Sequence, residues 1–122
     1  MNRGHETTSH RLLKGHVADV LLLRGWIVRF ETGNADVVAY RPGHAGIWSI
    51  ECERTAKWVI RNITRDVANG VGGVVVVVPS SGMASAILKR IALLPPGLLE
   101  KVAVVTVSQF NESYVEAIME KE

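Results

Sequence analysis

The chain has 122 residues, of which 48% are hydrophobic and 21% charged, and its formal net charge is +2. This length and composition predict one globular domain, residues 1–122, that is large enough to bury a core. The small net charge means that any basic surface must be local. The single cysteine, Cys52, excludes an intramolecular disulfide and a cysteine-based zinc site.

The first residues and the longest apolar run bear on whether the chain is secreted or spans a membrane. The N-terminal MNRGHETTSHR has no apolar segment of the kind found in signal peptides. The run at 73–79 is far below the roughly 18 residues that span a bilayer. We therefore expect a cytoplasmic protein with a flexible lead at 1–7 and a buried, unreactive Cys52.

Apolar periodicity predicts a helix followed by a meander of three strands. Leu13, Val17, Val20 and Leu21 recur at helical spacing within 8–24, where Thr8 or Ser9 would cap the start and Gly25 would end the helix. Alternating and β-branched residues then predict strands at 26–31, 35–40 and 47–52, with turns at 32–34 and 41–46.

A second helix, predicted at 55–69, has two distinct faces. The apolar face is expected to be buried and comprises Ala56, Ile60, Ile63 and Val67. The other face carries a basic stripe of Arg54, Lys57, Arg61 and Arg65. Such a stripe fits either a solvated helix face or a surface that binds phosphates.

The C-terminal half alternates strands with helices. Five consecutive valines at 74–78 predict a central strand that is covered on both faces. A helix at 83–94, a strand at 102–107 and a last helix at 109–121, capped by Ser108, would follow. The predicted fold is α/β, with the order α-β-β-β-α-β-α-β-α and a mixed five-stranded sheet that has helices on both faces.

Symmetric pairing of the hairpin at 35–52 places Asp36 opposite Glu51. Side chains alternate along a strand, so Asp36, Glu51 and Glu53 would share one face and leave the other face apolar. Opposed carboxylates destabilise a sheet by a few tenths to about 1 kcal/mol. A divalent cation such as Mg²⁺ would remove this penalty, and a solvated outer face is the alternative reading.

The motif and the order of elements resemble the PD-(D/E)XK phosphodiesterase superfamily, which has the restriction-endonuclease-like fold. The α-β-β-β-α-β core of that family matches residues 8–79, and the remaining α-β-α would be a C-terminal extension. Asp36 matches the Asp of the family's second strand and Glu51 the acidic residue of the (D/E)-x-K triplet. The resemblance implies a nuclease that hydrolyses DNA with Mg²⁺ or Mn²⁺ at these residues.

The sequence departs from the family pattern at two positions. Ala35 replaces the usual Pro, and Glu53 stands where the triplet has Lys. Some branches of the superfamily have such an E-x-E form with a Lys on the following helix, which would be Lys57 here. The resemblance then implies Asp36, Glu51 and Glu53 as metal ligands and Lys57 as the residue that positions water or stabilises charge.

Other residues have predicted roles as well. Glu6, near the first helix, would complete the metal site, as an acidic residue does in resolvase-like relatives. Arg54, Arg61 and Arg65 would bind phosphates, and Tyr40 would stack on a base or pack in the core. The expected assembly is a homodimer or a larger DNA-processing complex, and Phe110, Tyr114, Val115 and Ile118 would either form the dimer surface or pack within the chain.

Two other interpretations remain open. The first is a catalytically degenerate module on the same fold that binds nucleic acid or serves assembly, which the replacement of Lys by Glu53 would explain. The second is a general α/β interaction domain whose acidic face has no chemical role. Binding of a divalent cation would distinguish the second from the others, and cleavage would distinguish the nuclease from the degenerate module.

Overall fold

The computed structural model of the chain describes residues 7–30, 36–44 and 46–121. The predicted turn at 32–34 and Glu6, with most of the predicted lead, lie outside the described residues. None of the described helices is both long and apolar enough to cross a membrane. The elements in chain order are α1 (Thr8–Leu23), β1 (Ile27–Phe30), β2 (Val37–Tyr40), β3 (Trp48–Cys52), α2 (Val59–Ala68), β4 (Gly73–Val78), α3 (Ser81–Ile91), α4 (Pro96–Leu99), β5 (Val102–Thr106), the 3-10 turn η2 (Val107–Gln109) and α5 (Glu112–Ile118).

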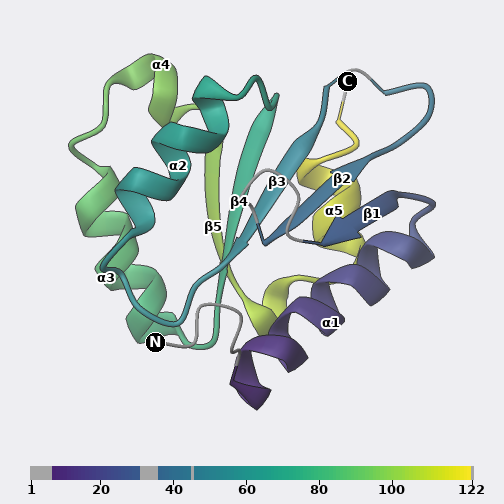
Figure 1. Cartoon of the computed structure of the whole chain (residues 1–122), viewed down its shortest axis with the longest axis horizontal. Helices are drawn as coiled ribbons and strands as arrows, with labels where there is room; N and C mark the ends of the chain where they lie inside the picture. The colour runs from purple at the N-terminus through teal and green to yellow at the C-terminus, as the bar shows by residue number, and fades with distance from the viewer. Residues whose placement is uncertain (1–6, 31–35, 45, 122) are drawn as a thin grey trace.

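The strands form one mixed sheet in the order β1-β2-β3-β4-β5 (Figure 1). The first three strands pair antiparallel, whereas β4 pairs in parallel with β3 and β5 pairs in parallel with β4. In the hairpin Val38 faces Ser49, which confirms the symmetric register expected from the sequence. A slip of one residue would turn the apolar side chains of one of these strands away from the core, which disfavours that alternative.

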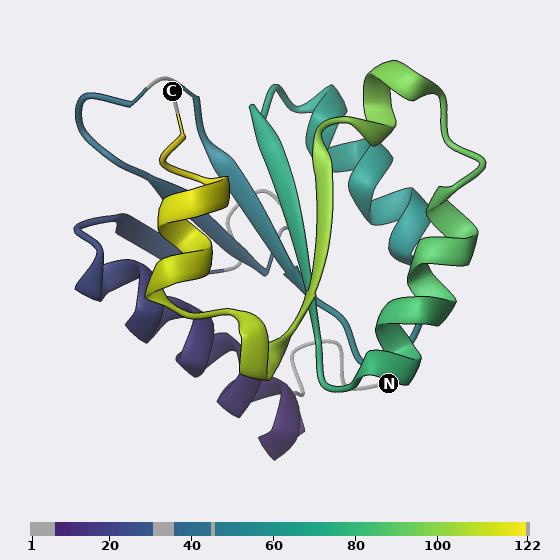
Figure 2. The same ribbon diagram turned by 180° about the vertical axis from the view of Figure 1, so that it is seen from behind.

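Helices cover both faces of the sheet, as predicted. α1 and α5 lie on one face, and α2 and α3 lie on the other (Figures 1 and 2). The central strand β4 serves both layers: Val75 and Val77 pack beneath α1 and α5, whereas Val74, Val76 and Val78 pack beneath α2 and α3. All five valines are fully buried, which confirms the covered central strand.

The neighbouring strand β3 is apolar on one face and polar on the other. Ile50 and Cys52 belong to the core under α1 and α5, which confirms the predicted apolar face and the buried cysteine. Ser49 and Glu51 point to the opposite side, where they contact residues of α2. The alternative of a solvated acidic face is wrong for Glu51, because α2 leaves only 2% of this residue exposed.

The predicted start of the second helix, at residue 55, is wrong. The Thr55 hydroxyl accepts a hydrogen bond from the Lys57 amide, so the chain makes a local turn before α2 begins at Val59. At the N-cap position, Trp58 supplies no side-chain hydrogen bond. The basic residues Arg54 and Lys57 therefore lie on the segment that leads into the helix, whereas the prediction placed them on one face of the helix together with Arg61 and Arg65.

The predicted C-terminal helix also begins too early, and Ser108 does not cap it. Residues 107–109 form η2, and Phe110 then adopts an extended conformation with its side chain fully buried. α5 begins at Glu112, three residues later than predicted, and its cap is Asn111, whose side chain accepts a hydrogen bond from the Tyr114 amide at 2.9 Å. The helix predicted at 83–94 likewise ends earlier, at Ile91.

Most of the apolar residues considered for a dimer surface pack within the chain. Phe110 and Val115 are fully buried in the core beneath α1, and Tyr114 packs against that core. Ile118 is 40% exposed. The intramolecular alternative is therefore correct for the first three of these residues.

The carboxylate of Glu120 connects three segments that are far apart in the sequence. Glu120 is 6% exposed and pairs with Arg24 at the end of α1 (2.6 Å) and with Arg41 after β2 (3.0 Å). It also accepts a hydrogen bond from the indole of Trp26 at 2.9 Å. The Arg24 hydrogen bond outweighs the effect of burial and lowers the pKa of Glu120 to about 2.

Replacing this carboxylate should destabilise the fold. We expect Glu120→Gln to lower the free energy of unfolding at pH 7 by about 2 kcal/mol, because charged hydrogen bonds to two arginines are lost. A lowered folded-state pKa means that the contribution is complete above the ordinary value of 4.5 and disappears as the pH falls to about 2. Urea denaturation at pH 7 and at pH 3 should therefore show a smaller difference between the two proteins at pH 3.

Glu116→Gln is the matched control for this measurement. Glu116 is 68% exposed and lies 3.8 Å from the same arginine, so its loss should cost less than about 0.5 kcal/mol. Equal stability of the Glu120→Gln protein and the wild type at pH 7 would contradict a structural role for the cluster.

Candidate metal centre

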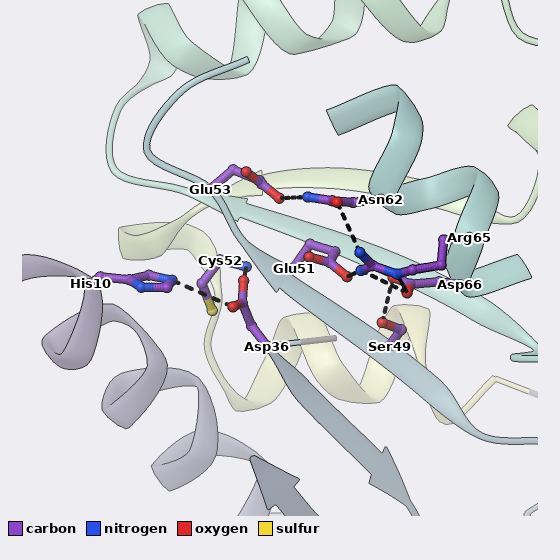
Figure 3. Close-up of polar contacts among 9 residues, drawn as sticks. All are labelled: His10, Asp36, Ser49, Glu51, Cys52, Glu53, Asn62, Arg65 and Asp66. Carbon is purple, nitrogen blue, oxygen red and sulfur yellow. Dashed lines mark hydrogen bonds and ion pairs between the residues drawn. The ribbon is translucent and has the colours of Figure 1, made fainter. Parts of the chain in front are cut away.

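Three carboxylates converge where β2 begins and β3 ends. Asp36 immediately precedes β2, Glu51 lies within β3, and Glu53 follows it (Figure 3). One oxygen from each lies within 4.8 Å of the others. The antiparallel register brings the start of one strand beside the end of the other, so the structure assembles the three acidic residues that the sequence singled out.

Each of these carboxylates is oriented by a hydrogen bond from a different donor. The amide of Cys52 donates to Asp36 Oδ2 at 2.8 Å, because this N–H points toward β2 beyond the last paired residue of that strand. Arg65 donates to Glu51 Oε2 at 3.1 Å. Asn62 donates to Glu53 Oε2 at 2.9 Å. The carboxylates are thus held in place before any ligand arrives.

One turn of α2 supplies further hydrogen-bonding support for the carboxylates. Arg65 bonds to Asn62 and to Asp66, and Asp66 accepts a hydrogen bond from the Ser49 hydroxyl at 2.7 Å (Figure 3). Residues three and four apart lie on one face of a helix, so Asn62, Arg65 and Asp66 all face the polar side of β3. The result is a continuous network from Glu53 to Ser49.

The electrostatics of the network favour an added positive charge. Among the described residues, the centre brings together four acidic side chains (Asp36, Glu51, Glu53 and Asp66) and the guanidinium of Arg65. Burial, followed by the neighbouring Asp66, raises the pKa of Glu51 to about 10, and this outweighs the opposing ion pair with Arg65. Burial also raises the pKa of Glu53, although the Asn62 hydrogen bond works in the other direction.

His10 joins the centre from the first helix. Its Nε2 lies 3.6 Å from Asp36 Oδ1, and the two side chains are 18% and 22% exposed (Figure 3). The helix begins one turn earlier at its Thr7 cap, so α1 places this imidazole at its N-terminal end beside the start of β2. A protonated His10 would stabilise the Asp36 carboxylate.

A cavity of about 210 Å³ opens beside the carboxylates. Its described lining consists of His10, Asp36, Glu51, Cys52, Glu53, Arg54, Thr55 and Asn62. Burial raises the pKa of the Cys52 thiol well above its usual range, so this side chain stays protonated and is a poor metal ligand. The three clustered donors are carboxylate oxygens, which fit hard cations such as Mg²⁺ and Mn²⁺.

The predicted basic residues do not lie together around this cavity. Arg54 is exposed and lines it. The Lys57 ammonium and the Arg61 guanidinium lie over the exposed Trp58 ring, at 4.9 and 4.3 Å from its centroid. Arg65 turns inward to the two buried carboxylates.

Of the two other predicted site residues, Tyr40 lies away from the carboxylates and Glu6 is not among the described residues. Tyr40 is at the far end of β2, about 13 Å along the strand from Asp36, and it lines a separate cavity with His44 and Ile47.

Sequence reasoning missed three residues of the centre, His10, Asn62 and Asp66, and also the inward role of Arg65. Asp66 gave a usable signal, because it falls at helical spacing from Val59 and Ile63 and thus on the buried side of α2. A polar residue there requires a buried partner, and Ser49 supplies it. His10 gave no comparable signal, since its place depends on how α1 packs on the sheet.

No protein-family model, curated protein or solved structure matches this chain. The fold and the centre together define an α/β protein with a five-stranded mixed sheet and a cluster of carboxylates suited to a hard divalent cation. Any more specific assignment rests on the geometry described above.

Removing one carboxylate should stabilise the protein when no metal is present. We expect Glu51→Gln to raise the free energy of unfolding by about 1 kcal/mol in chelator at pH 8, because Glu51 must take up a proton when the chain folds and the amide, which keeps the same shape, need not. A folded-state pKa of about 10 means that the carboxyl group costs stability increasingly as the pH rises above 4.5. The wild type should therefore lose stability from pH 6 to pH 9 more steeply than the variant, as measured by urea denaturation in EDTA.

Divalent cations should reverse this ranking. Addition of Mn²⁺ should raise the melting temperature of the wild type and leave that of Glu51→Gln unchanged, because the cation binds the folded state through this carboxylate. Glu100→Gln, a change at an exposed residue after α4, serves as the control and should behave as the wild type. A Glu51→Gln protein that is less stable than the wild type in EDTA would contradict the electrostatic interpretation.

Proposed function

We propose that the protein is a metal-dependent phosphodiesterase that hydrolyses DNA. The observation that carries the proposal is the convergence of Asp36, Glu51 and Glu53 within 4.8 Å, with Glu51 buried, at the edge of an open polar cavity. Buried carboxylates that outnumber their positive partners are costly unless a ligand compensates them. A divalent cation that also binds a phosphate is the ligand that fits this position.

In this proposal Asp36, Glu51 and Glu53 hold Mg²⁺ or Mn²⁺. When bound, the cation would polarise the phosphodiester and lower the pKa of a coordinated water. The hydrogen bonds from the Cys52 amide, Arg65 and Asn62 keep the three carboxylates turned toward one point. Arg65 then acts as a positioning residue, which differs from the phosphate contact expected from the sequence.

Other residues of the chain would bind the anionic substrate. Arg54 lines the cavity and is exposed, so its guanidinium is suited to a phosphate beside the reacting one. Lys57 and Arg61 both contact the half-exposed Trp58 ring. Together they form a second cationic surface next to the start of α2. An aromatic ring flanked by cations is a surface that nucleic acids bind.

The order of elements from α1 to β4 supports membership of the PD-(D/E)XK superfamily as part of the same proposal. Asp36 before β2 and Glu51 in β3 stand where that fold carries its metal ligands. Glu53 takes the place of the family lysine, and Lys57 would compensate for it by leaving the Trp58 ring when substrate binds. We further propose a cytoplasmic location and assembly as a homodimer or with a DNA-processing complex.

The first test is cleavage of labelled DNA in Mg²⁺ and in Mn²⁺, with single-stranded, duplex, flap and four-way forms. We expect Asp36→Asn to reduce the rate at least about 100-fold, since the amide removes a charged metal ligand and keeps the shape. Asp19→Asn, at an exposed position of α1, is the control and should retain wild-type activity. Cleavage that persists in Asp36→Asn would refute the assignment of this centre.

The degenerate binding module is the second candidate, and the position of Lys57 is the observation that favours it. The ammonium lies on the Trp58 ring, and Lys57 is absent from the described lining of the acidic cavity. A protein of this kind would bind DNA through Arg54, Arg61 and Trp58 without cutting it.

Lys57→Ala separates the two candidates. If Lys57 stabilises charge during hydrolysis, we expect kcat to fall about 100-fold with little change in KM. Lys89→Ala, at an exposed lysine of α3, provides the matched control. DNA binding with no cleavage by the wild type in either metal would establish the binding module, and unchanged kcat in Lys57→Ala would remove this residue from the mechanism.

A further inference from the structure

A second cavity, of about 370 Å³, lies at the same edge of the sheet and differs in character from the acidic one. Leu12 and Leu13 of α1, Pro79 after β4 and Val107 after β5 give it an apolar wall. These residues surround the carboxyl ends of the parallel strands, at the lower edge of the sheet in Figure 1. Ligands of open α/β sheets bind outside these strand ends.

The two cavities adjoin each other. Arg54 lines both of them, and the consecutive residues Ser9 and His10 line one each. Arg54 is the one charged residue in the described lining of the apolar cavity. A ligand that spans the two cavities would therefore need an anionic group beside Arg54 and the carboxylate centre, and a flat or apolar group against the leucines.

A nucleotide has this combination of groups. We propose that the apolar cavity binds one unpaired base of the DNA strand whose phosphodiester lies at the acidic cavity, with Arg54 on the phosphate between them. The inference rests on the proposed phosphodiesterase function and narrows its substrate to DNA with an unpaired or extruded nucleotide next to the cut. A base that is stacked and paired within a duplex cannot enter such a cavity.

The size and exposure of the cavity agree with this occupant. Ligand pockets begin at about 300 Å³, so the cavity has room for a single base and its sugar and little more. Leu12 is 69% exposed at the rim, whereas its neighbour Leu13 is 6% exposed in the wall. An apolar rim and a closed wall let one face of a base contact the leucines while the backbone stays in solvent.

The test uses single-stranded oligonucleotides with an abasic site at each position around the bond that is cut. Binding is measured in Ca²⁺, and cleavage in Mg²⁺. We expect the abasic site at one position adjacent to the cut to weaken binding by the wild type about tenfold, and other positions to have little effect. Leu12→Glu should weaken binding of the intact strand to a similar degree and should be insensitive to the abasic site at that position.

Leu23→Glu is the matched control, because Leu23 is 72% exposed on the same helix and lies outside the described lining of this cavity. It should bind and cleave as the wild type does. An abasic scan without a sensitive position, or equal effects of the two leucine changes, would overturn the base-binding inference. Sedimentation that shows loss of a dimer in Leu12→Glu, with DNA binding unchanged, would assign the cavity to a second copy of the chain and would also overturn it.

Failure of this inference and failure of the proposed function give different results. If cleavage depends on Asp36 and no abasic position weakens binding, the base site is refuted and the proposed phosphodiesterase function is retained. A sensitive abasic position in Ca²⁺ without cleavage in Mg²⁺ supports the base site on a binding module. Absence of single-strand binding by the wild type in Ca²⁺ would refute the base site, and lack of cleavage of all four DNA forms would refute the phosphodiesterase.

Discussion

The ion pair of Arg65 with two buried carboxylates is the interaction on which the centre depends. Glu51 and Asp66 are each 2% exposed, and the same guanidinium nitrogen contacts both. Without Arg65, the Asp66 carboxylate would be buried between α2 and β3 with no positive partner, and such an uncompensated charge costs several kcal/mol. The helix that completes the second core with Val59 and Ile63 therefore also fixes the carboxylates. Packing of α2 and the geometry of the acidic centre are consequences of the same contact.

The position of the centre follows from the mixed pairing of the sheet. β3 is antiparallel to β2 and parallel to β4, so its carboxyl end meets the beginning of one neighbour and the end of the other. The beginning of β2 brings Asp36, which a parallel strand would have placed at the opposite edge. The parallel side brings the loops after β4 and β5, which include Pro79 and Val107. An acidic cavity and an apolar cavity thus become neighbours because the strand direction changes at β3.

The parts of this arrangement that local patterns determine were predictable from the sequence. The hairpin register was predicted from symmetric pairing about the loop at 41–46, and that register also placed Asp36 near Glu51. Alternation of apolar and polar residues supports it by excluding a slip of one residue. The start of the last helix was wrong because Ser108 and Asn111 are both good caps, and burial of Phe110 decides between them. The role of Arg65 was missed for a related reason: periodicity identifies a basic face of α2, but the carboxylates opposite that face come from another element.

The same network explains why the carboxylates carry a cost that a ligand can recover. Hydrogen bonds from the Cys52 amide and Asn62 orient Asp36 and Glu53 without neutralising them, and Arg65 is shared between Glu51 and Asp66. The metal-free protein lowers this cost by retaining a proton on Glu51, whose pKa is raised to about 10. A divalent cation would replace that proton and compensate several carboxylates at once. The order already imposed on the carboxylates means that such a cation would bind with little loss of side-chain freedom, which is the advantage of a preorganised site.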